Sequence, residues 1–255
     1  MIMPPMHGRL QHDQFFIYAA ADCLYFDQYG KTLIESISRN TNYPLHLHLF
    51  NPRDNQVQYC IDRGVSVTHE YIPDDLFVQS IACTLQDTDR GKVLASKCIK
   101  LGIDSYDIYM DKVYYTCARF IRLAEILKQS NSVLIIDVDA IVRKQFPLPV
   151  GNSFYVHKFE VFKRIMCGVM YITEGGHQFY NYFTQLLLTH FDNDDIVWEL
   201  DQLALRKAVR QFNQYGLLPE SYIDWRFRED SYIWTAKGNR KDRKVFREEL
   251  QKYIS

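Results

Sequence analysis

Two aspartates separated by a single residue follow a short, strongly apolar segment of the chain. Val133 to Ile136 is a run of four large aliphatic residues, and Asp137 and Asp139 come directly after it. A buried parallel strand of this kind ends at the edge of an open α/β sheet where ligands bind. Side chains two positions apart in an extended segment point to the same side, so we expect the two carboxylates to share one divalent cation.

Carboxylate oxygens suit a hard cation such as Mn²⁺ or Mg²⁺, which keeps further positions open for phosphate oxygens. Such a metal neutralises the charge that builds on a departing diphosphate. The alternative interpretation is that Asp137 and Asp139 only end a strand or begin a turn.

Apolar runs alternate with helical patterns along the chain, which predicts an α/β fold with a mostly parallel central sheet flanked by helices. Residues 74–112 have mixed polarity and predict irregular or helical excursions. The expected strands span residues 15–21, 45–50, 65–72, 133–136, 154–157 and 168–172. The expected helices span 28–39, 56–63, 114–129, 177–190 and 200–212, with a loop and a short helix within the basic tail 237–253.

The overall composition is that of a globular protein and gives no sign of a nucleic-acid or membrane partner. The chain has 255 residues and a net charge of −1, so nothing in its balance indicates nucleic acid. Its first 14 residues lack the apolar stretch of a signal peptide, and no apolar run approaches transmembrane length. The six cysteines form no Cys-x-x-Cys pair and predict free thiols. We therefore expect a soluble, cytoplasmic protein without a transmembrane segment.

The Asp-x-Asp segment resembles the motif of the same form in GT-A nucleotide-diphospho-sugar glycosyltransferases. The first strand and its exit, from Tyr18 to Tyr25, resemble the start of the glycogenin and galactosyltransferase-like (family 8-like) group. The resemblance implies that Ala20 offers its backbone to a uracil base, that Asp22 contacts it and that Tyr25 stacks on it. A core role for Tyr25 is the alternative.

Three further segments follow in the order of that family. Arg119 matches the arginine of the helix before the Asp-x-Asp strand, and the resemblance implies that it reaches the donor. Gly168 matches a glycine that lets the sugar approach the backbone. Asp201 and Gln202 match a pair beside the reacting sugar, which makes them catalytic candidates together with Arg119; Asp201 can instead cap the following helix.

The segment near the C-terminus resembles a His-x-x-Gly-x-x-Lys-like loop that binds metal and phosphate. Lys237, Gly238, Arg240 and Lys241 suit a diphosphate, and we place Val138 with them in the donor-binding set. The chain departs from the pattern at the histidine, where Trp234 and Thr235 stand. The sequence therefore does not identify the third metal ligand, and water or the Thr235 hydroxyl are the candidates.

Taken together, the resemblance implies one GT-A catalytic domain over residues 1–255. It divides into a nucleotide-binding half (1–140), a sugar and acceptor half (141–235) and a basic C-terminal loop and helix (236–255). The implied activity is metal-dependent transfer of a hexose from UDP-glucose or UDP-galactose. The resemblance favours retention of configuration, and inversion with Asp201 as the base is the alternative. The acceptor, a glycan, a protein or a small molecule, is not predicted.

Other interpretations of the same residues remain. In a haloacid-dehalogenase-like phosphatase Asp137 would be a nucleophile and Asp139 an acid/base, with Asp194 and Asp195 as a later metal pair. That motif continues with Gly-Thr, whereas this chain continues with Ala140-Ile141. A nucleotidyltransferase would need a glycine-rich basic loop after the first strand, which residues 19–22 lack. A non-catalytic module that binds sugar nucleotides or glycans would carry the same binding residues.

His46 and His48 alternate along an expected strand and share one face. Because the sequence offers no evident third ligand, we expect a solvated or hydrogen-bonded pair of histidines here and not a metal site.

Overall fold

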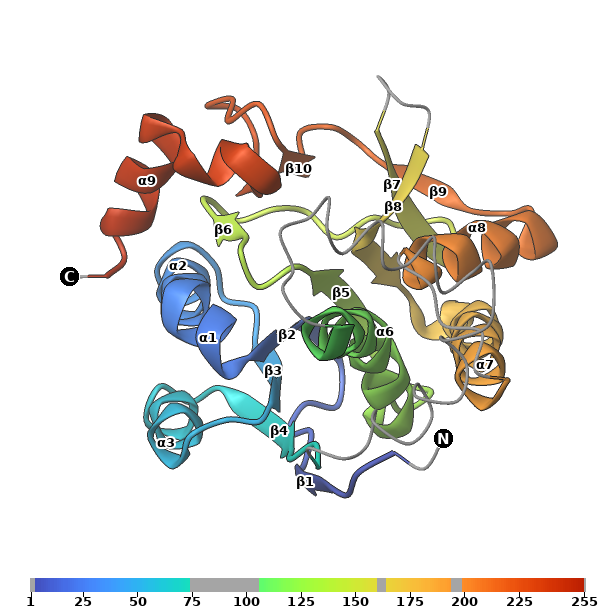
Figure 1. The fold of residues 1–255 in the computed structure, drawn as a ribbon. Coiled ribbons are helices and arrows are strands. Elements are labelled where there is room, and N and C mark those ends of the chain that lie inside the picture. Colours follow the sequence, from blue (N-terminus) through green and yellow to red (C-terminus); the bar gives the residue numbers. More distant parts are fainter. Residues whose placement is uncertain (1–2, 74–105, 160–163, 194–198, 255) are drawn as a thin grey trace.

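A computed structural model describes residues 3–73, 106–159, 164–193 and 199–254 (Figure 1). Its centre is an eight-stranded sheet in the order β1-β4-β3-β2-β5-β8-β7-β9. The strands are β1 Met6–Gly8, β2 Phe15–Asp22, β3 Leu45–Phe50, β4 Ser66–Glu70, β5 Ser132–Ile136, β7 Phe154–Phe159, β8 Arg164–Ile172 and β9 Gly216–Leu218. A three-stranded sheet, β10-β11-β6, joins Ile223–Asp224, Ile233–Trp234 and Ile141–Val142.

Helices cover both faces of the large sheet, which confirms the predicted α/β class (Figure 1). Strands β4, β3, β2 and β5 run parallel to one another, whereas β8 runs antiparallel to both of its neighbours. The α-helices are α1 Cys23–Tyr25, α2 Lys31–Asn40, α3 Asp54–Asp62, α6 Tyr106–Ile126, α7 His177–Asp192, α8 Leu200–Phe212 and α9 Lys244–Gln251. Three other helical segments are η1 Phe26–Gly30, η2 Glu174–Gly176 and η3 Gly238–Asp242.

The central strands are apolar on both sides because both sides of the sheet are covered. In β2, Phe16 and Tyr18 belong to the cluster under α6, α7 and α8, whereas Ile17 and Ala19 belong to the cluster that includes α2. This is the period of two that a strand imposes, applied to a doubly covered sheet. Strands β2 and β5 therefore appear in the sequence as nearly unbroken apolar runs, whereas β3 alternates leucine with histidine.

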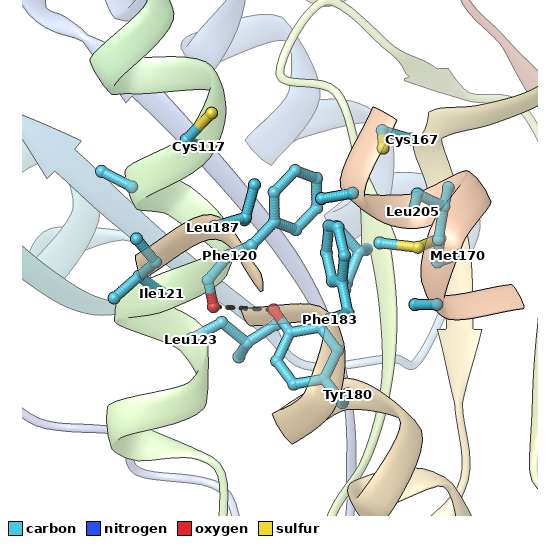
Figure 2. Close-up of a cluster of buried hydrophobic side chains, with 14 of the residues drawn as sticks. Cys117, Phe120, Ile121, Leu123, Cys167, Met170, Tyr180, Phe183, Leu187 and Leu205 are labelled. Atoms are coloured by element: carbon cyan, nitrogen blue, oxygen red, sulfur yellow. Dashed lines mark hydrogen bonds between the residues drawn. The ribbon is translucent and has the colours of Figure 1, made fainter. Parts of the chain in front are cut away.

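The cluster on the α6 side holds that helix rigidly against the sheet. Figure 2 shows side chains of α6, α7, α8 and β8 meeting there, with the Tyr180 hydroxyl donating to the Phe120 carbonyl over 2.9 Å. Tyr18 of β2 donates its hydroxyl to the carbonyl of Arg119 over 2.7 Å. Because of these contacts, the face of α6 that carries Arg119 has a fixed position relative to β2.

Several boundaries differ from the sequence predictions. Helix α6 begins at Tyr106 and ends at Ile126, so the expected helix 114–129 starts too late and runs too far. The prediction of irregular structure fails for 106–112, which belong to this helix, and residues 74–105 lie outside the described ranges. The two aspartates do not continue the extended strand, because the Ala140 amide donates to the Asp137 carbonyl over 3.0 Å and closes a turn.

His46 and His48 each hydrogen-bond to side chains of β4 and are not solvated. Both rings are buried on β3; His46 bonds Ser66 over 2.7 Å and Thr68 over 3.0 Å, and His48 bonds Thr68 over 3.0 Å. Burial, followed by the charges of His48 and His12, lowers the pKa of His46 to about 3. His46 is therefore neutral in the folded protein near neutral pH.

We expect the free energy of unfolding to fall as the pH drops below about 6.5, the pKa of histidine in an unfolded chain. Below this pH His46 binds a proton in the unfolded chain but stays neutral in the folded protein. Acid therefore favours unfolding. Between pH 7.5 and 5.5 this residue alone should remove about 1.4 kcal/mol, which urea unfolding at the two pH values would measure.

The variant His46→Gln should lose that part of the pH dependence, whereas His7→Gln, at an exposed position, should keep it. Equal stability of the wild-type protein at both pH values would contradict the prediction.

No helix within the described ranges is long and apolar enough to cross a membrane.

Candidate functional site

One cavity of about 360 Å³ opens at the carboxyl ends of β2 and β5. The sequence-predicted residues reach it from five separate segments of the chain. Those that line it are Ala20, Asp22, Tyr25, Arg119, Asp137, Val138, Asp139, Asp201, Gln202, Lys237, Gly238 and Lys241. The chain thus brings together every predicted site residue except Arg240.

Arg119 connects two acids of the cavity. Its Nη1 lies 2.5 Å from Asp137 Oδ1, and its Nη2 lies 3.8 Å from Asp201 Oδ2. The Arg119 side chain is 12% exposed; its partial burial disfavours the charge, but the charges of Asp137 and Asp201 outweigh that and raise its pKa. A planar fork of N–H donors suits this bridging position, and it leaves Arg119 charged at any pH.

Asp139 is buried and faces two partners from the C-terminal segment. Its Oδ2 lies 2.5 Å from Lys241 Nζ, and its Oδ1 accepts a hydrogen bond of 3.3 Å from the Thr235 hydroxyl. Burial and then the nearby charge of Asp137 raise the pKa of Asp139, although Lys241 and Thr235 oppose that effect. The two carboxylates therefore repel each other and are held by cations of the chain itself.

Gly168 on β8 makes room for the first of these acids. A Cβ at this position would lie 2.5 Å from Asp137 Oδ2, closer than real contacts allow. In this structure the Asp137 carboxylate fills the space beside Gly168. The sequence analysis expected the donor sugar in that space.

Asp201 and Gln202 lie in the first turn of α8. The N-cap of this helix is Glu199, in a left-handed conformation with φ of 65°, so the alternative that Asp201 caps the helix is wrong. Asp201 Oδ1 instead accepts a hydrogen bond of 2.8 Å from the backbone N–H of Gln202. The side-chain Oε1 of Gln202 accepts a hydrogen bond of 3.3 Å from the backbone N–H of Cys167. These bonds join α8 to β8 beside Gly168.

The end of β2 forms the other side of the cavity. Asp22 caps α1 by accepting from the Tyr25 amide over 2.8 Å, which fixes the exit of the strand. The Tyr25 side chain is 42% exposed and does not belong to the core, so the core alternative for this residue is wrong. Lys241 Nζ lies 4.7 Å from the ring centroids of both Tyr25 and Tyr29 and 3.3 Å from the Tyr25 hydroxyl.

Arg240 does not line the cavity. Its guanidinium lies 5.5 Å from the ring centroid of Trp225, because the 3₁₀ turn η3 sends consecutive side chains in different directions. Gly238 begins that turn with φ of 60°, a conformation that favours glycine. The phosphate-binding role predicted for Arg240 thus has less geometric support than that of Lys241.

Two lining residues carried no signal in the sequence. His157 is the first residue of β7 to pair with the antiparallel strand β8 after a register shift, and Trp225 follows β10. Neither belongs to a motif, and each reaches the cavity only through long-range strand pairing. An isolated histidine or tryptophan has no local pattern that would reveal such a role.

The residues around Asp137 and Asp139 fit a hard divalent cation. All nearby side-chain ligands are oxygens, from the two carboxylates and the Thr235 hydroxyl, which matches the preference of Mn²⁺ and Mg²⁺. Within the described ranges no cluster of three Asp, Glu, His or Cys side chains forms. The chain would therefore supply only part of a coordination sphere for such a cation, and other ligands would have to complete it.

Known proteins were compared at the levels of sequence and structure. No family model and no curated protein sequence matches the chain significantly. The galactosyltransferase LgtC, solved with donor and acceptor sugar analogs, is similar in structure with a TM-score of 0.58 and 12% identity, covering 94% of this chain and 96% of LgtC.

Two further glycosyltransferases share the fold. The apo form of GlyE from Streptococcus pneumoniae TIGR4 has a TM-score of 0.58 and 15% identity, covering 96% of this chain and 61% of GlyE. The bifunctional glycosyltransferase WbbM in its apo form has a TM-score of 0.58 and 12% identity, covering 95% of this chain and 51% of WbbM. The chain therefore has a GT-A fold and spans little more than half the length of these two proteins.

Proposed function

We propose that this protein is a glycosyltransferase that moves a hexose from a UDP-sugar, UDP-glucose or UDP-galactose, to an acceptor hydroxyl. The observation that carries the proposal is the pair Asp137 and Asp139, placed after the central strand β5 in one cavity with Arg119 and Lys241. The GT-A fold favours this function over the phosphatase, and Asp194 and Asp195, which the phosphatase needs, lie outside the described ranges.

The base of the donor is proposed to bind at the end of β2. The exposed ring of Tyr25 offers a flat π face, and Asp22 and the backbone of Ala20 line the same end of the cavity. Asp22 already uses one oxygen as a helix cap, which holds its carboxylate in place for a contact with uracil.

Asp137, Asp139 and the Thr235 hydroxyl are proposed to hold the divalent cation, Mn²⁺ or Mg²⁺. When bound, the cation would neutralise negative charge on the departing diphosphate. Lys241 and Lys237, which line the cavity, would add positive charge to the same phosphates. Lys241, whose Nζ lies 2.5 Å from Asp139 Oδ2, would compete with the cation for that oxygen.

Arg119, Asp201 and Gln202 are proposed to position the donor sugar at the β8 side of the cavity. Asp201 is 6% exposed and is contacted by Arg119 and the Gln202 backbone N–H, although burial raises its pKa as in a general base. Its contacts favour a positioning role and therefore a retaining reaction, in which the leaving phosphate accepts the proton of the acceptor. A β-linked product from an α-linked UDP-sugar, seen by NMR, would reject retention.

A screen for UDP release tests the proposed activity. The purified protein would be incubated with UDP-glucose, UDP-galactose and the corresponding GDP- and ADP-sugars, with Mn²⁺, with Mg²⁺ and with a chelator. We expect release of UDP from a UDP-hexose that depends on the added metal. Binding of UDP without any turnover would favour a non-catalytic sugar-nucleotide-binding module.

The predicted division of the domain and the predicted cellular location also belong to this proposal. The division into 1–140, 141–235 and 236–255 assigns the cavity residues of β2 and β5 to the nucleotide half and those of β8 and α8 to the sugar half. We propose a cytoplasmic protein, supported by Cys23, Cys60, Cys117 and Cys167, which are free thiols; Cys83 and Cys98 lie outside the described ranges.

We expect Lys241→Met to strengthen the binding of Mn²⁺ several-fold in the absence of nucleotide, because it removes a cation of the chain that lies 2.5 Å from Asp139 Oδ2. The same variant should bind UDP about tenfold more weakly, since it loses a charged partner for the diphosphate. Electron paramagnetic resonance of Mn²⁺ and isothermal titration with UDP would measure the two affinities.

The control is Lys244→Met, which removes the same charge from an exposed position on α9 and should change neither affinity. Unchanged binding of Mn²⁺ to Lys241→Met would show that the lysine does not compete with the cation.

A further inference from the structure

The cavity extends across four strands of the sheet and not only over the two that carry the acids. From one end to the other it is lined by β2 through Ala20, by the turn after β5 through Asp137, by β8 through Met166 and by β7 through His157. Neighbouring strands lie about 4.8 Å apart, so the β7 end is about 14 Å from the β2 end. A nucleotide held at β2 and phosphates held after β5 leave the β7 end for another ligand.

His157 lines this end and carries a buried ring nitrogen without a hydrogen-bond partner in the described part of the chain. The residue is 3% exposed, and its Nδ1 has no hydrogen-bond partner among the described protein groups. Burial lowers the pKa of His157, against the opposing charges of Glu220 and Asp224, so the ring is neutral. A neutral imidazole nitrogen that is desolvated in this way is stabilised when a ligand hydroxyl bonds to it.

Trp225 lies beside His157 on a turn that internal hydrogen bonds stabilise. The two residues also line a small void of about 10 Å³, so they are neighbours. Asp224 is buried and accepts from the Arg226 amide over 2.9 Å, the Arg228 amide over 2.7 Å and the Ser231 hydroxyl over 3.0 Å. These bonds hold the turn that presents Trp225 to the cavity.

The same turn contains backbone strain. Phe227 has φ of 64°, which a bulky residue adopts only where its surroundings impose it. Arg240 from η3 packs 5.5 Å from the centroid of the Trp225 ring and supports it on one side. Backbone strain together with several internal hydrogen bonds is typical of a turn that is preformed for binding. Here such a turn places an aromatic residue at the wall of a cavity.

We propose that His157 and Trp225 form the acceptor subsite and that the acceptor is a saccharide. An indole and a neutral hydrogen-bonding nitrogen match the two surfaces of a sugar ring, which has an apolar C–H face and a rim of hydroxyls. This rests on the proposed function. Transfer would join the acceptor oxygen to the anomeric carbon of the donor and break the bond from that carbon to the UDP oxygen, with the hydroxyl proton released to the leaving diphosphate or to water.

The test measures acceptor and donor KM values separately. With UDP-glucose or UDP-galactose as donor, methyl β-D-glucoside, methyl β-D-galactoside, maltose and N-acetylglucosamine are added at up to tens of millimolar, and UDP release and product formation are followed. We expect at least one saccharide to be glycosylated and to accelerate UDP release.

Two matched pairs of variants assign the subsite. For the active saccharide, Trp225→Ala should raise the acceptor KM about tenfold more than it raises the donor KM, whereas Trp225→Phe, which keeps an aromatic ring, should restore most of the affinity. His157→Leu should likewise raise the acceptor KM, and His157→Asn, whose amide places a polar atom near the position of Nδ1, should raise it less. Thermal unfolding checks that each variant is folded.

Three results would overturn the inference. Metal-dependent hydrolysis of the UDP-sugar without acceleration by any saccharide would reject a saccharide acceptor and leave the proposed function standing. A larger effect of Trp225→Ala on the donor KM than on the acceptor KM would place these residues at the donor sugar. A wild-type protein that releases no UDP from any donor would reject the proposed function and this inference with it.

Discussion

Replacing Asp139 with asparagine is expected to lower the rate of sugar transfer by about 10³-fold while the protein stays folded. The asparagine side chain keeps the size of the aspartate but not its negative charge, so it binds a divalent cation poorly and leaves the diphosphate charge without compensation. The measurement is kcat with saturating UDP-hexose and Mn²⁺, using the donor that releases UDP fastest.

The same variant should change the free energy of unfolding by no more than about 1 kcal/mol. Burial and the nearby Asp137 charge disfavour the ionised form of Asp139, so the acid contributes little stability in the ligand-free protein despite its contact with Lys241. Asp242→Asn serves as the control, because Asp242 is an exposed acid in the same C-terminal segment. Near-wild-type turnover of Asp139→Asn would reject the metal assignment.

Arg119→Ala is expected to destabilise the protein by about 3–5 kcal/mol, in addition to reducing transfer. The change leaves Asp137 and Asp201 without the cation that bridges them, and Asp201 is almost fully buried. Urea unfolding at pH 7.5 would measure the loss, and Arg119→Lys, which keeps the charge without the planar fork, should lose less.

Two comparisons isolate the cause of that loss. In a protein that already carries Asp201→Asn, Arg119→Ala should lower the free energy of unfolding by a smaller amount. One of the two acids that the substitution leaves without a cation is then uncharged. Lys128→Ala removes an ion pair with Asp13 on the surface and should cause little or no change. Equal costs of Arg119→Ala in both backgrounds would mean that the arginine acts through packing and not through the acids.

The core strands were predictable because burial on both faces leaves a strong local signal. The predicted strand 45–50 coincides with β3, and the predicted helix 200–212 coincides with α8. Strands of two or three residues, such as β10 and β11, were missed, because they are defined by pairing with distant partners and contain too few residues for a pattern. The start of α6 was missed for a different reason, since residues 106–112 mix apolar and charged side chains.

The candidate site was predictable where residue type and position in a strand determine the chemistry. Asp137 and Asp139 could be found because they follow a buried strand, although the structure holds them in a turn and not in an extended segment. The pairing of each acid with its own cation could not be foreseen, since Arg119 and Lys241 are far apart in the sequence. His157 and Trp225 were missed because only the fold brings them to the same cavity.

Thermal unfolding with UDP, GDP, CDP and ADP, each with and without Mn²⁺, tests the nucleotide site most directly. A ligand at about one hundred times its dissociation constant adds about 2.7 kcal/mol to the stability of the folded state, which raises the Tm of a chain of this size by about 5–10 °C. The account predicts that rise for UDP and requires Mn²⁺ for it. No shift with any nucleotide, together with stabilisation by Mg²⁺ and a phosphate analogue, would contradict the sugar-nucleotide site and favour a phosphatase.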